Sequence, residues 1–173
     1  QGLREAAQGK DASLTDEEMA RILTQYKKQA EAQQLLELKK QAEANSRIGN
    51  AFLAENAKKS GVQTTASGLQ YEVLQSGNGE IHPSASSTVR VHYHGTLIGG
   101  TVFDSSVDRG ETISFPLNRV IPGWTEGLQL MKPGAKYRFF IPAELAYGQI
   151  GSGDVIEPNS TLIFDIELIE VMK

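Results

Sequence analysis

The residues of this chain that could do chemistry are a few polar groups set among aromatic side chains. Asp104 follows Phe103 in TVFDSS, Tyr93 lies between two histidines in VHYH, and Tyr147 lies in LAYG. Trp124, the only tryptophan, follows a Pro-Gly pair in VIPGWTEG. A buried carboxylate and buried phenols need hydrogen-bond partners. We therefore interpret this set as a ligand pocket rather than as core alone.

Three other kinds of site, a metal pair, a catalytic triad and a phosphate-binding loop, have weaker support in the sequence. His92 and His94 share one face of a predicted strand, as two metal ligands would, but the sequence offers no evident third ligand. Asp104 and Ser105 lie near these histidines without the ordering of a catalytic triad. The segment GSGD at 151–154 lacks the lysine and the following helix of a phosphate-binding loop. We therefore expect neither a metal nor a cofactor.

The composition argues against several other classes of protein. The 173 residues carry a net charge of −4 without a basic stripe, which argues against the binding of nucleic acid. There is no cysteine, so disulfides, thiolate chemistry and cysteine-based zinc sites are excluded. No stretch approaches the ~18 uninterrupted apolar residues of a spanning helix. The apolar fraction of 39% is typical of an ordinary globular protein.

The elements that must position the candidate residues follow two patterns, which divide the chain into residues 1–60 and 61–173. The first part predicts one long helix over about 16–59. Thr15 is a typical N-cap, with Glu18 three residues later as in a capping box. Apolar residues are sparse along this helix, which is typical of an exposed strut. We expect the helix to stand clear of the second part and neither to line nor to close the pocket.

From about residue 66 the pattern changes to the alternation of apolar and polar residues that predicts strands. In the last strand Leu162, Phe164, Ile166 and Leu168 share one face. A short helix fits Thr125–Met131. The strands are expected at 69–74, 88–95, 136–142 and 161–171. Several antiparallel strands with one short helix predict an α+β domain of about 110 residues, enough for a core of its own.

Four segments of the second part resemble the FKBP-type peptidyl-prolyl cis-trans isomerases in their order and spacing. They read VRVHYHGTLIGGTVFDSSVDRGETISF, VIPGWTEGLQLMKPG, IPAELAYG and IEPNSTLIFDIELIEV, and the match runs from about Gly68 to the C-terminus. The long helix before them resembles the macrophage infectivity potentiator (Mip) branch of the bacterial members. The resemblance implies an FKBP-like antiparallel β-sheet wrapped around a short helix and preceded by a long, largely solvent-exposed α-helix.

The resemblance also implies an apolar pocket for proline, with Trp124 as its floor. Many members have an aromatic residue where Ile113 stands, so we expect a flatter wall there. Glu157 stands where a proline is frequent, in a glycine-rich rim loop that we expect to be mobile. Both departures bear on substrate preference more than on activity. The residues that would bind substrate or inhibitor are Tyr93, Phe103, Asp104, Arg109, Ile113, Val120, Ile121, Trp124, Tyr147, Ile156 and Phe164.

The implied reaction is rotation of an X-Pro amide, with Asp104, Tyr147 and Tyr93 as catalytic residues. The backbone N–H of Ile121 and the hydroxyl of Tyr147 would hold substrate carbonyls. Asp104, supported by Tyr93 and Arg109, would stabilise the twisted amide. A structural role for Asp104, capping the turn in FDSS, stays open as the alternative. The rotation breaks no bond between heavy atoms, so the lack of a catalytic triad agrees with this reaction.

The implied partners are proline-containing unfolded or extended polypeptides and macrolide FKBP inhibitors, with no nucleic acid. The first residues, QGLREAAQG, resemble the last turns of a helix, so we expect a chain that was processed or cut from a longer one. The Mip branch implies a homodimer through the N-terminal helices. It also implies the bacterial periplasm, the outer membrane or the cell surface, with the cytoplasm as the alternative. Two other functions stay open: a client-binding chaperone module with incidental turnover, and a structural dimeriser.

Overall fold

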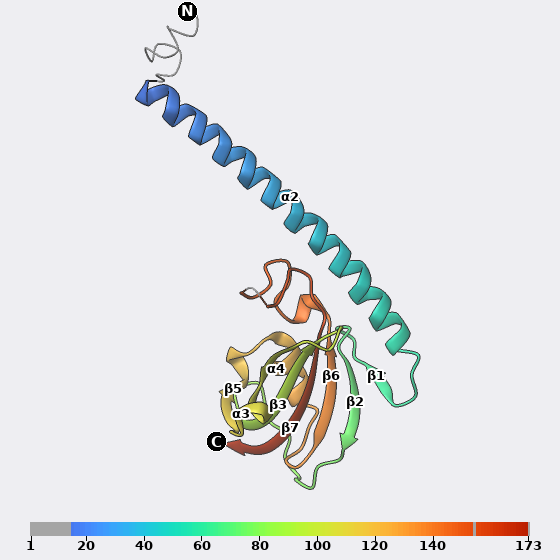
Figure 1. Cartoon of the computed structure of the whole chain (residues 1–173). Helices are drawn as coiled ribbons and strands as arrows, with labels where there is room; N and C mark the ends of the chain where they lie inside the picture. The colour runs from blue at the N-terminus through green and yellow to red at the C-terminus, as the bar shows by residue number, and fades with distance from the viewer. Residues whose placement is uncertain (1–14, 154, 173) are drawn as a thin grey trace, which may run out of the picture. The chain divides into compact units, whose positions relative to one another are not determined.

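The computed structural model describes residues 15–153 and 155–172 (Figure 1). The helical end expected in residues 1–9 lies outside them. The chain divides into two compact units after Lys40. This division falls within the predicted long helix, so the end of that helix belongs to the second unit. Among the helices of the described ranges, none combines the length and the apolar character needed to cross a membrane.

In the described part of the chain, the first unit is the N-terminal part of α2 (Asp16–Asn56). Its predicted start is confirmed, because Thr15 Oγ1 accepts a hydrogen bond from the backbone N–H of Glu18 at 3.0 Å. Acidic residues fill the first turn, where they suit the positive end of the helix dipole. Every residue from 15 to 40 is exposed, in agreement with the largely exposed helix that the sequence predicts.

The last turns of α2, residues 41–56, belong to the second unit and pack on its sheet. Asn56 is 1% exposed, and its Nδ2 donates a hydrogen bond to Gln70 Oε1 at 2.8 Å. The ring centroid of Phe52 lies 5.9 Å from that of Phe140. The expectation that the helix stands clear of the second part is therefore wrong for these turns. The pattern of apolar residues does not predict this contact, because polar side chains such as Asn56 and Gln70 make much of it.

The second unit is built on a seven-stranded antiparallel sheet with the order β1-β2-β6-β7-β3-β4, and β5 pairs with β3. The predicted strands correspond to β2, β3, β6 and β7. The sequence does not predict the three short strands, because three or four residues give too little alternation. The strands are β1 (Val62–Thr64), β2 (Gln70–Gln75), β3 (Thr88–Leu97), β4 (Val102–Ser105), β5 (Ile113–Pro116), β6 (Lys136–Ile141) and β7 (Leu162–Met172).

The remaining elements of the second unit are short. α4 begins earlier than the predicted helix Thr125–Met131, because Pro122 stands in its first turn, where the fixed φ of proline suits a helix. α4 also lies close to the sheet: a Cβ built on Gly127 would come within 2.6 Å of the Phe139 ring. These elements are α3 (Ser106–Arg109), a 3-10 turn (Leu117–Arg119), α4 (Pro122–Leu128) and a second 3-10 turn (Ala143–Leu145).

The core lies between α4 and the sheet. The alternating residues of β7 that share one face are all buried, as their pattern predicts. Trp124 and Tyr93 belong to the same buried cluster, so the core extends to the start of α4. Other large buried side chains of the cluster are Leu69, Val89, Val91, Leu117, Leu128, Met131, Phe139 and Ile141.

Candidate active site

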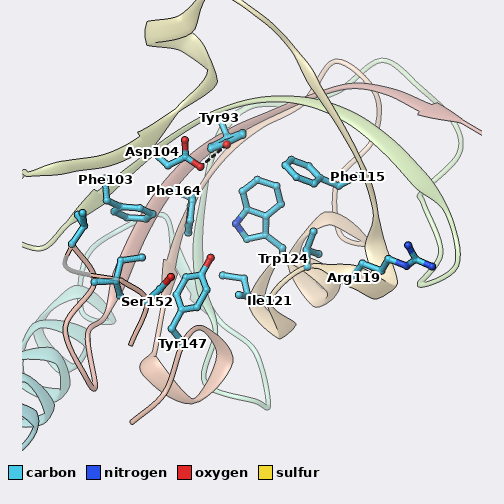
Figure 2. Close-up of a pocket in the computed structure, with 13 residues that line it drawn as sticks. Tyr93, Phe103, Asp104, Phe115, Arg119, Ile121, Trp124, Tyr147, Ser152 and Phe164 are labelled. Atoms are coloured by element: carbon cyan, nitrogen blue, oxygen red, sulfur yellow. Dashed lines mark hydrogen bonds between the residues drawn. The ribbon is translucent and has the colours of Figure 1, made fainter. Parts of the chain in front are cut away.

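A cavity of about 570 Å³ opens where the sheet, the start of α4 and the segment after β6 meet (Figure 2). Aromatic and aliphatic side chains make up most of its lining, with a few polar groups among them. Such a cavity is the usual form of a small-ligand site. The lining residues are Tyr93, Phe103, Asp104, Phe115, Arg119, Val120, Ile121, Trp124, Tyr147, Ser152, Val155, Ile156 and Phe164.

Trp124 lines this cavity and is 4% exposed. Three rings meet its indole at steep angles: Tyr93 at 77°, Phe115 at 89° and Phe164 at 86°, with centroids 5.1 to 5.5 Å away. Edge-to-face contacts of this kind fix the plane of the indole. Its Nε1–H has no hydrogen-bond acceptor among the described residues. The Pro-Gly corner thus starts a helix whose tryptophan serves as core on one side and as cavity lining on the other.

Asp104 is fixed at the wall of the cavity by two donors. The hydroxyl of Tyr93 donates to Asp104 Oδ2 at 2.6 Å, the dashed contact in Figure 2. Arg109 donates to Asp104 Oδ1 at 2.6 Å and to the Tyr93 hydroxyl at 3.1 Å. Arg109 ends α3, whose N-cap is Ser105 and whose C-cap Gly110 has a φ of 74°. A one-turn helix with a cap at each end therefore positions the Arg109 guanidinium against the Asp104 carboxylate.

Burial and these contacts shift the pKa values of Asp104, Tyr93 and Tyr147. Burial by itself would raise the pKa of Asp104, but the hydrogen bonds from Tyr93 and Arg109 and the positive charge of Arg109 together lower it. Burial, and then the bond to Asp104, raise the pKa of the Tyr93 phenol. Burial, and then the charge of Asp104, raise that of Tyr147. Near neutral pH Asp104 is therefore a carboxylate, and the phenols of Tyr93 and Tyr147 are protonated.

The Tyr147 hydroxyl and the Ile121 backbone N–H are hydrogen-bond donors that the cavity offers to a ligand. Tyr147 follows the second 3-10 turn and is 38% exposed, and Figure 2 shows its hydroxyl pointing into the cavity. Ile121 is the N-cap of α4. Within the described ranges, its backbone N–H donates to no protein acceptor. A buried ligand carbonyl needs such donors, because a lost hydrogen bond inside an apolar site is costly.

The structure brings all the predicted binding residues to this cavity except Arg109 and Ile113. Arg109 acts from outside the lining, through Asp104 and Tyr93. Ile113 pairs with Val91 and packs on the core. The wall expected to be flatter at Ile113 carries Phe115, which the sequence analysis missed although ISFP places both residues on one strand face. Three other lining residues were not predicted: Arg119, Ser152 and Val155.

The two histidines beside Tyr93 have structural partners. His92 Nδ1 lies 2.7 Å from Ser106 Oγ, and His94 Nδ1 lies 2.8 Å from Ser105 Oγ. Within residues 15–153 and 155–172 no cluster of three or more His, Cys, Asp or Glu side chains is arranged to hold a metal ion. The histidines therefore tie the start of α3 to β3, and the hydroxyl that caps α3 belongs to Ser105.

Comparison with known proteins finds one family along most of the chain. Residues 79–169 match the model of the FKBP-type peptidyl-prolyl cis-trans isomerases, and residues 1–73 match that of the domain amino terminal to FKBP-type peptidyl-prolyl isomerase. The FKBP-type peptidyl-prolyl cis-trans isomerase FkpA of Aeromonas hydrophila is 52% identical over 165 residues, which are 95% of this chain and 61% of the relative. The outer membrane protein MIP of Legionella longbeachae is 45% identical, over 99% of this chain and 73% of the relative.

Comparison with solved structures finds relatives from the same family. The crystal structure of FkpA from Escherichia coli matches with a TM-score of 0.85 and 43% identity, over 98% of this chain and 80% of that one. The chain spans about three fifths of the length of the two FkpA relatives from Aeromonas hydrophila and Neisseria meningitidis, 61% and 60% respectively.

Proposed function

The chain belongs to the FKBP-type peptidyl-prolyl cis-trans isomerases, and on that premise we propose that it accelerates rotation about X-Pro bonds in protein substrates. The proline would enter the cavity and rest on Trp124. One observation carries the proposal: an aromatic cavity with a fixed carboxylate, Asp104, on its wall.

The chemistry of the cavity suits this reaction. Rotation must overcome a barrier of ~18–20 kcal/mol that comes from resonance between the amide nitrogen and its carbonyl. Water solvates the planar, dipolar amide better than the twisted one, so an apolar cavity favours the twisted state relative to water. No bond between heavy atoms breaks, and the reaction therefore needs neither nucleophile nor general base. The ring of aromatic side chains around Trp124 supplies such surroundings.

The polar groups of the cavity would then orient the substrate. The Tyr147 hydroxyl and the Ile121 N–H would donate to the carbonyls that flank the proline. Asp104 would stabilise the twisted amide through its negative charge, which Tyr93 and Arg109 hold in place. A charge that is oriented before the substrate arrives needs no reorganisation during the reaction. The lowered pKa of Asp104 supports this role, because the carboxylate is ionised near neutral pH.

A second candidate function is that of a client-binding chaperone. It is favoured by apolar side chains that lie exposed on the first part of α2, namely Met19, Ile22, Leu23 and Tyr26. Exposed apolar side chains on one stretch of helix are a common basis for contact with unfolded chains. The match to a protein named for the outer membrane supports a site of action outside the cytoplasm.

The proposed activity is tested by measuring cis-trans turnover of a short X-Pro peptide by the full chain, with and without a macrolide FKBP inhibitor. We expect turnover well above the uncatalysed rate and its loss at saturating inhibitor. The same chain is added to an aggregating client that lacks proline. Suppressed aggregation together with no peptide turnover would favour the chaperone function and contradict the enzyme.

A further inference from the structure

The segment between the second 3-10 turn and β7 forms one side of the cavity, and we name residues 147–153 and 155–161 the rim segment. It contributes Tyr147, Ser152, Val155 and Ile156 to the lining. Its only strand-like pairing in the described chain is the bridge between Ser152 and Ile156. A segment with so few ladder hydrogen bonds needs other anchors if it is to hold side chains over a ligand.

The anchors come from α2. Asn45 Nδ2 donates to the carbonyl of Pro158 at 2.9 Å. In the reverse direction, Asn159 Nδ2 donates to the carbonyl of Ala42 at 3.2 Å. Both hydrogen bonds are partly buried and lie within one compact unit, which begins at Gln41. Two amide side chains thus join the helix to the rim segment in opposite directions.

Asn159 connects these two hydrogen bonds to the part of the rim segment that carries Tyr147. Its φ of 58° is the one positive value outside glycine in the described part of the chain, and asparagine tolerates that region better than most residues. In this conformation its backbone N–H donates to the carbonyl of Gly148 at 2.8 Å, directly after Tyr147. The same residue therefore holds α2 with its side chain and the neighbour of Tyr147 with its backbone.

The helix approaches the rim segment closely enough to require a glycine. Gly49 is buried in the middle of a helical run, where glycine is less favourable than alanine. A Cβ built at Gly49 would collide with the hydroxyl of Thr161, itself 4% exposed. The contact thus explains a residue that helix propensity disfavours.

We propose that Asn45 and Asn159 are positioning residues of the isomerase site, so that residues 42–49 of α2 hold the rim segment over Trp124. The inference rests on the proposed function and deepens it. In the described chain, Trp124 and Asp104 have no contact with α2 that holds them in place, whereas Tyr147 and Ile156 depend on the rim segment for their positions. An unanchored rim segment must be ordered when substrate binds, and that cost weakens binding. The two asparagines therefore act on KM more than on kcat.

The sharpest test is Asn45→Asp in the full chain, because it keeps the size of the side chain and removes its donor. Gln41→Glu is the matched control: it makes the same change of charge on an exposed residue of the same helix. We expect Asn45→Asp to raise KM for an X-Pro peptide about three- to tenfold, as loss of one hydrogen bond would, with little change in kcat. The control is expected to keep both constants.

A second measurement does not depend on activity. Hydrogen exchange of the Gly151 and Asn159 amides, both bonded within the rim segment, should become faster in Asn45→Asp than in the control. Asn159→Gly is the second variant, because it permits the positive φ but lacks the side chain that bonds to α2. It should show the same rise in KM and the same faster exchange, and it replaces Asn45→Asp as the test if Asn45→Asp folds poorly. Equal KM and equal exchange in both variants and the control would overturn the inference. A wild-type chain without turnover would refute the proposed function instead, and the exchange comparison would still decide the anchoring.

Discussion

The wall of the cavity (Tyr93, Asp104, Trp124 and Phe164) and its rim segment are held by different means. The wall comes from α4 and from strands that share continuous ladders, and its rings are packed edge to face. The rim segment has one isolated bridge and is joined to α2 by amide side chains. We infer from this difference that the wall sets the rate of rotation and that the rim segment sets which substrates are bound.

The largest effect is expected at the wall. Asp104→Leu removes the carboxylate that the described residues contribute to the cavity and should lower kcat for an X-Pro peptide about tenfold or more, because a charge oriented before the reaction is a major part of catalysis. Asp108→Asn on the neighbouring α3 serves as the control. Circular dichroism should show an unchanged fold in both. Full activity of Asp104→Leu would leave Asp104 with a structural role only.

The next largest effect is expected from removal of the helix that supports the rim segment. A chain that begins at Gly61 loses Asn45, Phe52 and Asn56 together, leaving Gln70 and Phe140 uncovered. We expect its free energy of unfolding to be about 2–4 kcal/mol lower. We expect its kcat/KM for an X-Pro peptide to be about three- to tenfold lower. A chain that begins at Gln41 keeps these contacts and should match the full chain. Equal stability of the two shortened chains would contradict the packing described for α2.

A smaller effect is expected from a single group of the rim segment. Tyr147→Phe removes one hydroxyl from the cavity while keeping its ring, and should lower kcat/KM about two- to fivefold through the lost hydrogen bond to substrate. The loss is expected mainly in KM, in contrast to the kcat effect of Asp104→Leu. Tyr137→Phe, in which a partly buried phenol outside the cavity is altered, provides the control. If Tyr147→Phe lowered kcat and left KM unchanged, the rim segment would act in the rotation step itself rather than in substrate binding.

The smallest effect is expected from pH. The folded pKa of Asp104 is lowered, so its ionised form stabilises the fold above its unfolded pKa, near 3.9, and that contribution disappears as pH falls through the lower folded value. The raised pKa values of Tyr93 and Tyr147 keep both phenols protonated up to about pH 10. Peptide turnover should therefore be level between about pH 5 and pH 9. A bell-shaped profile in that range would reveal a titrating group that the mechanism does not include.

The sequence predicts the wall better than the rim segment for a physical reason. Long strands such as β7 alternate apolar and polar residues, and motif resemblance identifies Trp124 and Asp104 on them or beside them. The resemblance points to Ile113, whereas Phe115, two residues later on the same face of the strand, lines the cavity. The anchoring of the rim segment depends on Asn45 and on polar contacts between residues distant in the chain. Periodicity of apolar residues does not detect such contacts.

The single tryptophan has a consequence for observing the protein at work. Trp124 is nearly buried, yet it lines the cavity, and its Nε1–H has no acceptor in the described protein. Light of a longer wavelength than tyrosine absorbs excites this indole alone, so its emission reports one place in the molecule. A macrolide resting on the ring should change that emission in proportion to occupancy. The unlabelled protein thus contains its own optical probe for titrating ligands.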